Sequence, residues 1–557
     1  MVSILQIFSI SFFFWMIMSF LRFVFDTLGA FRISSSTRTR LGFFMASIGG
    51  VGISICLFLL LLFEFGLEHI FYDGNGIERE AALAALFIWL MCVAVGGYVA
   101  ARLYTHELPV LASSVAVGSI AACITLAVLV LGSQAFEGEL PLLFIGASVG
   151  TVLATLFGVY IAYALNTRER VRYEAQRTRA EGARIQPHEV AVVIAAHNEE
   201  LTIGATIQSL LALTTPEHIY IGSDGSTDKT VEVVHSFECH ADDIQPNRGK
   251  AGALSYVLDH NDILSKYKAV FFLDADITVD KTFYRYTLPY FDDPRVAAAS
   301  GYFEAVWPAH FIPRWELLIT AYRIRLWRVL QFFVRYGQTW RRMNMSPIVP
   351  GGASIYRTSA LRNITIHVPG LVIEDFNMTF ELHHKKLGRI VFEPRARVYD
   401  QEPYSVRDFV KQIKRWYLGY FQTMRHHGVW PSFFCLSTYF FTAELLISSV
   451  LFVLIPVLLL ELMLGNRDVL VLDFYVWGYS VTLLSIFIAA VVIDFVITIG
   501  VALVERKPLL LLYGIGFFPL RYVESAVFLA MLPLAFVGRS DGRWESPKRK
   551  SFETKIS

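Results

Sequence analysis

Long apolar runs occupy both ends of this 557-residue sequence and leave a polar segment between them. Five runs precede that segment, at 4–25, 41–66, 81–101, 109–132 and 141–165, and three follow it, at 432–464, 473–503 and 509–537. A helix that crosses a bilayer needs about 20 apolar residues, and every run meets this length. The sequence therefore predicts a protein embedded in a membrane by α-helices on both sides of a polar domain.

The composition favours the same interpretation. Hydrophobic residues make up 55% of the chain and charged residues only 17%, whereas a soluble protein has about 25% charged residues. The five cysteines are scattered and show neither metal-ligand spacing nor a disulfide framework. A net charge of +1 gives no reason to expect a nucleic-acid partner. We expect membrane lipid as a partner and no nucleic acid.

The charges of the loops set the expected orientation. Arginines follow the first, third and fifth runs, and acidic residues follow the second and fourth. Because basic loops remain in the cytosol, we expect an N-terminus outside, about five helices in 1–166 and a basic cytosolic linker at 167–188. The first run lacks the basic start of a signal peptide, so it predicts a retained anchor.

The C-terminal part is expected to contain a transmembrane and interfacial region at 431–538 and a basic cytosolic tail at 539–557. The run 509–537 contains Pro519, Arg521 and Glu524, so it predicts a re-entrant hairpin, two short helices or one imperfect span. Residues 312–345 and 404–430 mix aromatic and basic residues, which is typical of helices at a membrane surface with their basic residues toward lipid headgroups. We expect a multi-pass protein of the plasma (inner) membrane with its polar domain in the cytosol.

The polar segment 189–403 has the pattern of an α/β domain. Short apolar runs at 190–194, 218–221 and 268–273 each end in a polar turn, and a helix-like stretch follows the first of them. Strands that alternate with helices form a Rossmann-like, mostly parallel sheet, whose ligands bind beyond the carboxyl ends of the strands. The three polar turns therefore mark one candidate site.

The turn after 268–273 carries two carboxylates, Asp274 and Asp276. Carboxylates one residue apart can face one ligand, and hard oxygen ligands suit Mg²⁺ or Mn²⁺ that bridges phosphates. A solvated turn would show the same pattern. Its position after a buried strand favours a metal site at Asp276 and Asp274.

The other turns suit a nucleotide. Asn198 and Glu199 follow the first strand and Asp224 follows the second, although each could instead cap the next helix. Lys250 lies in a glycine-containing turn before a helix, where the helix amides and the ammonium suit a diphosphate. A solvated lysine in a capped turn is the structural alternative, and the Gly-Lys-Ser/Thr ending of a Walker loop is missing.

Two further motifs lie near the end of the polar segment. Acidic residues such as Glu374 and Asp375 are common in a first helical turn, but beside a metal-diphosphate site Asp375 is the best candidate for a catalytic base. Gln412, Arg415 and Trp416 fall at i, i+3 and i+4 and are expected to share a helix face. Arginine can hold a diphosphate and tryptophan can stack on a sugar ring, while an interfacial helix is the structural alternative.

Taken in order, these motifs resemble those of the family 2 inverting glycosyltransferases: Asn-Glu, Asp-Gly-Ser, Gly-Lys, Asp-x-Asp, Glu-Asp and Gln-x-x-Arg-Trp. The resemblance covers about 190–430 and implies a glycosyltransferase-A-type catalytic domain at 189–403, a Gln-x-x-Arg-Trp helix at 404–430 and a UDP-sugar donor. It also implies a role for each matching residue. These roles are nucleoside contacts for Asn198, Glu199 and Asp224, diphosphate for Lys250, metal and phosphate for Asp276 and Asp274, a base at Asp375 beside Glu374, and leaving group and acceptor for Gln412, Arg415 and Trp416.

Within the family, Gln-x-x-Arg-Trp beside apolar runs is typical of processive synthases, and the C-terminal stretch is similar to that of poly-N-acetylglucosamine synthases. The resemblance thus implies transfer from UDP-N-acetylglucosamine to a growing β-linked polysaccharide, with translocation. The small residues 351–354 lie where such enzymes have a segment near the acceptor. Two alternatives remain: transfer of one sugar to a lipid or polyprenyl-phosphate acceptor, and a transporter or channel with a nucleotide-binding domain.

Overall fold

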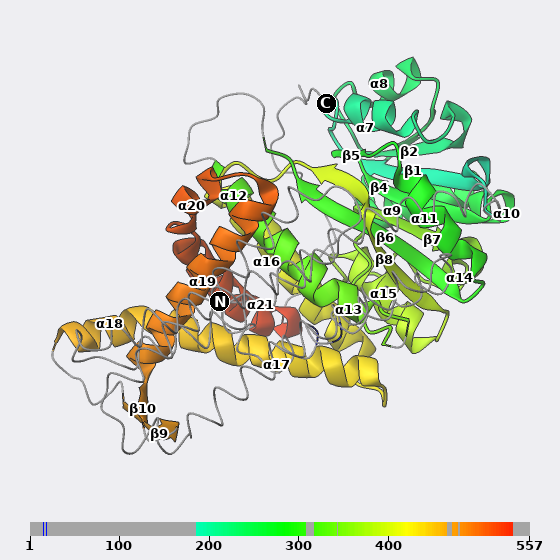
Figure 1. Cartoon of the computed structure of the whole chain (residues 1–557). Coiled ribbons are helices and arrows are strands. Elements are labelled where there is room, and N and C mark those ends of the chain that lie inside the picture. The colour runs from blue at the N-terminus through cyan, green and yellow to red at the C-terminus, as the bar shows by residue number, and fades with distance from the viewer. Residues whose placement is uncertain are drawn as a thin grey trace, which may run out of the picture. The chain divides into compact units, whose positions relative to one another are not determined.

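The computed structural model describes residues 15, 18, 185–307, 317–341, 343–464, 471–476 and 479–537 (Figure 1). Apart from residues 15 and 18, the predicted N-terminal membrane region lies outside these residues, as do most of the linker at 167–188 and the tail at 539–557. The described chain divides into two compact units, one formed by 185–453 with 516–537 and the other by 454–515. The candidate site lies in the first unit.

The first unit is built on an eight-stranded sheet with the order β3-β2-β1-β4-β7-β6-β8-β5. The strands are β1 (Val190–Ala196), β2 (Ile219–Asp224), β3 (His240–Ile244), β4 (Ala269–Asp274), β5 (Ile277–Val279), β6 (Val296–Ala305), β7 (Ala353–Arg357) and β8 (Arg389–Asp400). β1 runs parallel to β2 and β4, with Ala195 opposite Asp274 and Ala196 opposite Ser223. The three strands expected from the apolar runs are thus neighbours, and their polar turns meet at one edge.

The sheet as a whole is mixed, and most of its strand pairs are parallel, as expected. β7 pairs antiparallel with β4 and β6, and β5 pairs antiparallel with β8, while β6 and β8 are parallel. When two neighbouring strands run antiparallel, one begins beside the residue at which the other ends. The residues before β7 therefore reach the carboxyl end of β4, where the Asp274 amide donates to the Gly352 carbonyl at 3.0 Å.

Each face of the sheet carries its own apolar core, because successive strand residues point to opposite faces. Val192 and Ile194 pack with α7 (Ile203–Leu210), α8 (Thr230–Ser236) and α11 (Phe283–Thr287). Ala191 and Val193 pack with α9 (Gly249–His260), α10 (Ile263–Lys266), α14 (Thr358–Leu361) and α15 (Glu374–His384). Short 3₁₀ turns complete the domain: η2 (Pro187–Glu189), η3 (Pro216–His218) and η4 (Leu288–Asp292).

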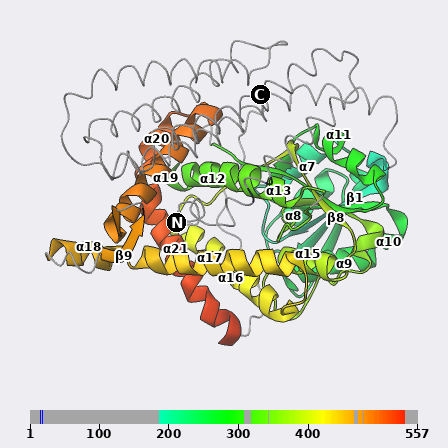
Figure 2. The same cartoon turned by 60° about the horizontal axis from the view of Figure 1, so that its bottom comes forward.

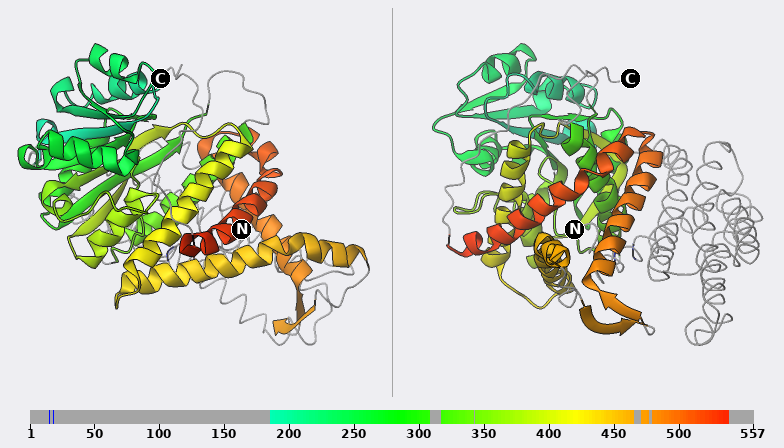
Figure 3. Two further views of the ribbon diagram at one scale, coloured as in Figure 1. Left: turned by 180° about the vertical axis from the view of Figure 1, so that it is seen from behind. Right: turned by 90° about the vertical axis from the view of Figure 1, so that its left-hand side faces the viewer.

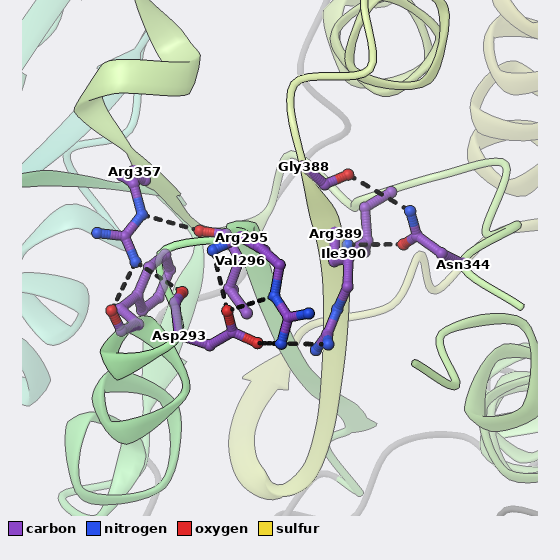
Figure 4. Close-up of polar contacts among 9 residues, drawn as sticks. Asp293, Arg295, Val296, Asn344, Arg357, Gly388, Arg389 and Ile390 are labelled. Atoms are coloured by element: carbon purple, nitrogen blue, oxygen red, sulfur yellow. Dashed lines mark hydrogen bonds and ion pairs between the residues drawn. The ribbon is translucent and has the colours of Figure 1, made fainter. Parts of the chain in front are cut away.

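A polar cluster ties together the ends of β6, β7 and β8 (Figure 4). Asp293 accepts from the Arg295 side chain at 2.9 Å and lies 3.4 Å from Arg389 Nη1. Arg357 donates to the carbonyls of Val296, Phe291 and Asp293. The hydrogen bonds from Arg295 lower the pKa of Asp293 to about 2. This cluster fixes the antiparallel part of the sheet from the end opposite the candidate site.

The same unit contains further helices. Between β6 and β7 lie α12 (Leu317–Val329), the π-helical turn η5 (Leu330–Arg335) and α13 (Tyr336–Gln338), and after β8 lie α16 (Val406–His427), α17 (Phe433–Val453) and α21 (Phe517–Val537). α16 begins at Ser405, whose hydroxyl accepts from the Asp408 amide at 3.1 Å as an N-cap does. α21 packs against both α16 and α17 (Figure 2). The view from behind in Figure 3 shows α16 running from the sheet domain toward the start of α17.

The second unit contains α18 (Ile455–Met463), an antiparallel pair formed by β9 (Val471–Val476) and β10 (Tyr479–Thr482), α19 (Leu483–Glu505) and α20 (Leu509–Gly514). The run 509–537, for which three forms were open, thus forms two helices, α20 and α21. Within the described part of the chain, two helices are long and apolar enough to cross a membrane, Phe433–Val457 and Phe517–Val537.

Two basic residues of α12 are buried inside the protein, whereas the sequence predicts basic residues at a membrane surface. Arg323 and Arg325 are 1% and 2% exposed. Arg325 stacks on Phe517 with 4.4 Å between its guanidinium carbon and the ring centroid, and Arg323 lies against α16. Aromatic faces and a buried carboxylate hold these charges inside the protein, which a count of basic residues along one helix cannot foresee.

Candidate active site

Asp224, at the end of β2, is held by the loop that leads into α9. Its carboxylate accepts from the Arg248 amide at 2.6 Å, and its carbonyl accepts from the Asn247 side chain at 2.8 Å. The side chain is 3% exposed. Burial raises the pKa of Asp224, and the amides of Arg248 and Gly249 act in the opposite direction. These hydrogen bonds fix the Asp224 side chain relative to the start of α9.

Asn198 and Glu199, at the end of β1, make local contacts in the structure. The Asn198 amide oxygen accepts from the Thr227 backbone amide at 2.8 Å, and Glu199 accepts from the Thr202 hydroxyl at 2.7 Å. Asn198 has a φ of 57°, a left-handed conformation that asparagine tolerates better than most residues. The hydrogen bond between Asn198 and Thr227 joins the turn after β1 to the turn after β2. The two turns therefore lie side by side at the candidate site.

Lys250, in the first turn of α9, joins two of the predicted carboxylates. Its ammonium lies 2.7 Å from Asp274 Oδ1 and 2.8 Å from Glu374 Oε1. Burial disfavours the charge of Lys250, but the two carboxylates outweigh it and raise the pKa of the ammonium. Residues from α9, β4 and α15 therefore meet at one charged centre.

Asp375 lies beside this centre, at the start of α15. Its carboxylate accepts from the amides of Gly351 at 3.0 Å and Phe376 at 2.7 Å. Burial, with a further contribution from the charge of Glu374, raises the pKa of Asp375 to about 6. A carboxylate with such a pKa can accept a proton near neutral pH, which suits a general base.

The two glycines before β7 allow these side chains to approach one another. A Cβ atom on Gly351 would lie 2.9 Å from Glu374 Oε1 and 3.3 Å from Lys250 Nζ. One on Gly352 would lie 3.2 Å from Asp274 Oδ2. The small-residue segment predicted at 351–354 thus contacts the charged centre directly.

Asp276 and Arg415 complete the electrostatic pattern. Asp276 is buried, and the Ala275 carbonyl beside it accepts from the Thr206 hydroxyl at 2.8 Å. Burial lowers the pKa of Arg415, while the charges of Asp274, Glu374, Asp375 and Asp276 act against this effect. The charges of the predicted carboxylates of the α/β domain therefore act on Arg415 of α16.

Gln412 and Trp416 take a different direction from Arg415. Gln412 accepts from Arg323 Nη2 at 2.9 Å, and the Trp416 ring centroid lies 4.6 Å from the Arg323 guanidinium carbon. Gln412 and Trp416 therefore share a face of α16 that contacts α12, as their spacing predicts.

Sequence reasoning missed two arginines near the site. The charge of Asp375 acts on Arg335, at the end of η5, whose pKa burial lowers to about 10. Arg323 contacts the Gln-x-x-Arg-Trp helix. Both lie in the basic aromatic segment 312–345, whose pattern predicts a membrane-surface helix. The partner of Arg323 is Glu402, which lies far away in the sequence, so no local pattern could have found this pair.

The fold is an α/β domain with a mixed sheet, and the candidate site lies at the carboxyl ends of β1, β2 and β4. Residues 187–419 match the family profile described as glycosyltransferase like family 2. Residues 187–419 therefore form a family 2 glycosyltransferase domain, as the order of the motifs implied.

Several known proteins are similar to the chain. A poly-beta-1,6-N-acetyl-D-glucosamine synthase of Staphylococcus epidermidis is 25% identical over 379 residues, which cover 65% of this chain and 88% of that protein. The probable glycosyltransferase YdaM of Bacillus subtilis is 26% identical over 291 residues, which cover 47% of this chain and 66% of that protein. Among solved structures, a mannosyltransferase from Pyrobaculum calidifontis in complex with GDP-Man and Mn²⁺ matches with a TM-score of 0.37 and 14% identity, over 70% of this chain and 98% of that one.

Proposed function

We propose that this chain is an inverting, metal-dependent hexosyltransferase that transfers a sugar from a UDP-sugar to a growing β-linked polysaccharide and moves the product across the membrane. The observation that carries the proposal is the charged centre of Lys250, Asp274 and Glu374, with ammonium-to-carboxylate distances of 2.7 and 2.8 Å. Asp375, with a raised pKa, lies beside it. A cation, a metal-ligand turn and a base at one point suit sugar transfer from a nucleoside diphosphate.

In this proposal the donor binds at the carboxyl ends of β1, β2 and β4. Glu199 and Asp224, with Asn198 ordering the turn between them, contact the nucleoside. Lys250 exchanges its carboxylate partners for the diphosphate, and Arg415 adds positive charge from α16. The ordered loop at Asp224 supports this assignment, because Arg248 and Asn247 hold that residue in place before a ligand arrives.

The donor set also suits a divalent metal. Among the described residues, no group of three His, Cys, Asp or Glu side chains is arranged to hold a metal by itself. Mg²⁺ is commonly held by one or two carboxylates together with substrate phosphates. Asp276 and Asp274 would hold Mg²⁺ or Mn²⁺ with the diphosphate, and the metal would neutralise the charge of the leaving group.

The chemistry assigned to the chain is one displacement. The acceptor hydroxyl oxygen bonds to the anomeric carbon, the bond from that carbon to the diphosphate breaks, and UDP leaves with the electron pair. Asp375 takes the hydroxyl proton, while Glu374 keeps Lys250 aligned. Attack from the side opposite to the leaving group inverts the anomeric carbon from α to β.

The sugar and the product are inferred from relatives. The relatives from Staphylococcus epidermidis and Staphylococcus aureus are named poly-beta-1,6-N-acetyl-D-glucosamine synthases, which supports UDP-N-acetylglucosamine as the donor. The two apolar helices, Phe433–Val457 and Phe517–Val537, support a protein of the plasma (inner) membrane. The order of loop charges supports a cytosolic catalytic domain.

A donor panel with product sizing tests the proposal. Purified full-length protein with Mn²⁺ is given each UDP-sugar in turn, and UDP release and product length are measured. We expect polymer from UDP-N-acetylglucosamine, and no polymer from Asp375→Asn. Asp259→Asn, which removes an exposed carboxylate on α9, serves as the matched control and should behave as wild type. A lipid-extractable product that carries a single sugar would instead favour transfer to a lipid or polyprenyl phosphate.

A further inference from the structure

Arg323 of α12 is buried against the Gln-x-x-Arg-Trp helix. It is 1% exposed, and Nη2 donates to Gln412 Oε1 at 2.9 Å. The guanidinium carbon lies 4.6 Å from the Trp416 ring centroid and 4.9 Å from that of Phe409. Phe409, Gln412 and Trp416 are three or four residues apart along α16 and therefore lie on one face of that helix. The Arg323 side chain contacts all three.

A carboxylate after β8 compensates the charge of Arg323. Glu402 Oε2 lies 3.4 Å from Arg323 Nε, and Glu402 Oε1 accepts from the Trp327 indole at 2.6 Å. Glu402 is 2% exposed. Trp327 in turn packs against Trp416 with 6.0 Å between ring centroids and 51° between ring planes. The sheet domain, α12 and α16 therefore share one buried network.

This network acts on the position of the Trp416 ring. A guanidinium on one face and a tilted indole at 6.0 Å limit both side-chain torsions of Trp416. Trp416 remains partly exposed, so a ligand can reach the rest of the ring. The charges of the site carboxylates act on Arg415, the residue before Trp416.

We propose that Arg323 is a positioning residue for the acceptor: it holds the indole of Trp416 in the orientation that receives the terminal sugar ring of the acceptor. The inference rests on the proposed function, because Trp416 holds the acceptor only if sugar is transferred. Arg323 acts through Trp416 and Gln412 and takes no part in the displacement. The donor contacts proposed on the α/β domain, at Glu199, Asp224 and Lys250, do not include Arg323.

Fluorine NMR tests the orientation without any turnover. The full-length protein is labelled with fluorotryptophan, and Trp416→Phe assigns the resonance of Trp416. In Arg323→Met we expect this resonance to shift and broaden, while Arg323→Lys, which keeps the charge but not the planar stack, gives an intermediate shift. An unchanged Trp416 resonance in Arg323→Met overturns the inference, whatever the activity of the protein.

Kinetics test the consequence for the acceptor. With a short β-1,6-linked N-acetylglucosamine oligomer as the acceptor probe, Arg323→Met should raise the acceptor KM about tenfold and leave the UDP-sugar KM within about twofold. Arg323→Lys should recover part of the loss. Equal changes in both KM values, together with a lower melting temperature, would show a purely structural role and overturn the inference.

Arg325→Met is the matched control. Arg325 is on the same helix and equally buried, but it stacks on Tyr322 and Phe517. It should leave the Trp416 resonance and the acceptor KM unchanged, and a change equal to that of Arg323→Met counts against the proposal. A wild-type protein that transfers no sugar from any donor overturns the proposed function instead, and the resonance still decides whether Arg323 orients Trp416.

Discussion

Lys250 is the positive charge in contact with two carboxylates of the site. It lies within 2.8 Å of two carboxylates, so its single positive charge offsets part of the negative charge of Asp274 and Glu374 before a donor binds. A diphosphate that enters this centre brings further negative charge, which a lysine alone cannot neutralise. Because of this imbalance, we expect a divalent metal at Asp276 and Asp274 when the donor binds.

Replacement of Lys250 by methionine should lower kcat/KM by about 100-fold or more, because the diphosphate loses its ammonium and Glu374 loses its partner. UDP binding by calorimetry and steady-state rates measure the effect. Lys281→Met, which removes an exposed lysine, is the control. Rates equal to wild type in Lys250→Met would exclude a role in donor binding.

The pH dependence of the reaction should report Asp375. Its pKa is raised to about 6 by burial and by Glu374, and a base must be deprotonated to accept a proton. Log kcat/KM should therefore rise with pH to about 6 and level off above it. A profile that is flat between pH 5 and about 7 would contradict the assignment of Asp375 as base.

Gly351→Ala should reduce activity without unfolding the protein. The added Cβ would lie 2.9 Å from Glu374 Oε1, and Lys250 holds that carboxylate, so the charged centre must move. We expect a loss of about tenfold or more in kcat at an unchanged melting temperature. Gly204→Ala, whose Cβ would have its closest contact at 3.6 Å, is the control, and equal rates in both variants would refute the prediction.

At the scale of elements, α16 links the site to the helices that follow the sheet. The charges of the site carboxylates act on Arg415 of α16, and Gln412 and Trp416 of the same helix contact Arg323. Consecutive helix positions differ by about 100°, so Arg415 and Trp416 cannot point the same way. Further along, Tyr417 donates to Glu524 of α21 at 2.8 Å, and Tyr322 of α12 donates to the same carboxylate.

The hydrogen bonds to Glu524 should hold α12, α16 and α21 together. Tyr417→Phe removes one donor to a buried carboxylate, which should lower stability by about 1.5–3 kcal/mol. Thermal unfolding in detergent measures this change. Tyr522→Phe, on α21 with its ring against Phe452, is the control; a Tyr417→Phe melting temperature equal to that of wild type would show that the contact contributes nothing.

The part of the fold that sequence could predict is the part set by local pattern. β1, β2 and β4 are apolar runs that end in polar turns, so their existence and the edge they share follow from periodicity. The antiparallel insertion of β7 between β4 and β6 depends on pairing between residues far apart in the chain, which no local pattern records. Similarly, motif order indicated Lys250 and Asp375, but only tertiary packing reveals that Arg323 is buried.

At the scale of the whole molecule, the chain combines a family 2 glycosyltransferase domain with helices suited to a membrane. The family match at 187–419 includes Arg415 and Trp416 of α16, and the first of the two apolar helices begins at Phe433. The catalytic motifs and the membrane helices are therefore close along the chain. In the proposed function, the chain that carries the site thus continues directly into a helix suited to a membrane.

The most direct measurement is sugar transfer by purified full-length protein in the wild type, Asp276→Asn and Asp375→Asn forms, with and without a chelator. We predict transfer from a UDP-sugar in the wild type, its loss on chelation, its recovery with Mn²⁺ or Mg²⁺, and a fall of about 1,000-fold in both variants. Turnover that persists in Asp276→Asn or Asp375→Asn, or the absence of transfer from every UDP-sugar, would contradict a metal-assisted transferase at this site.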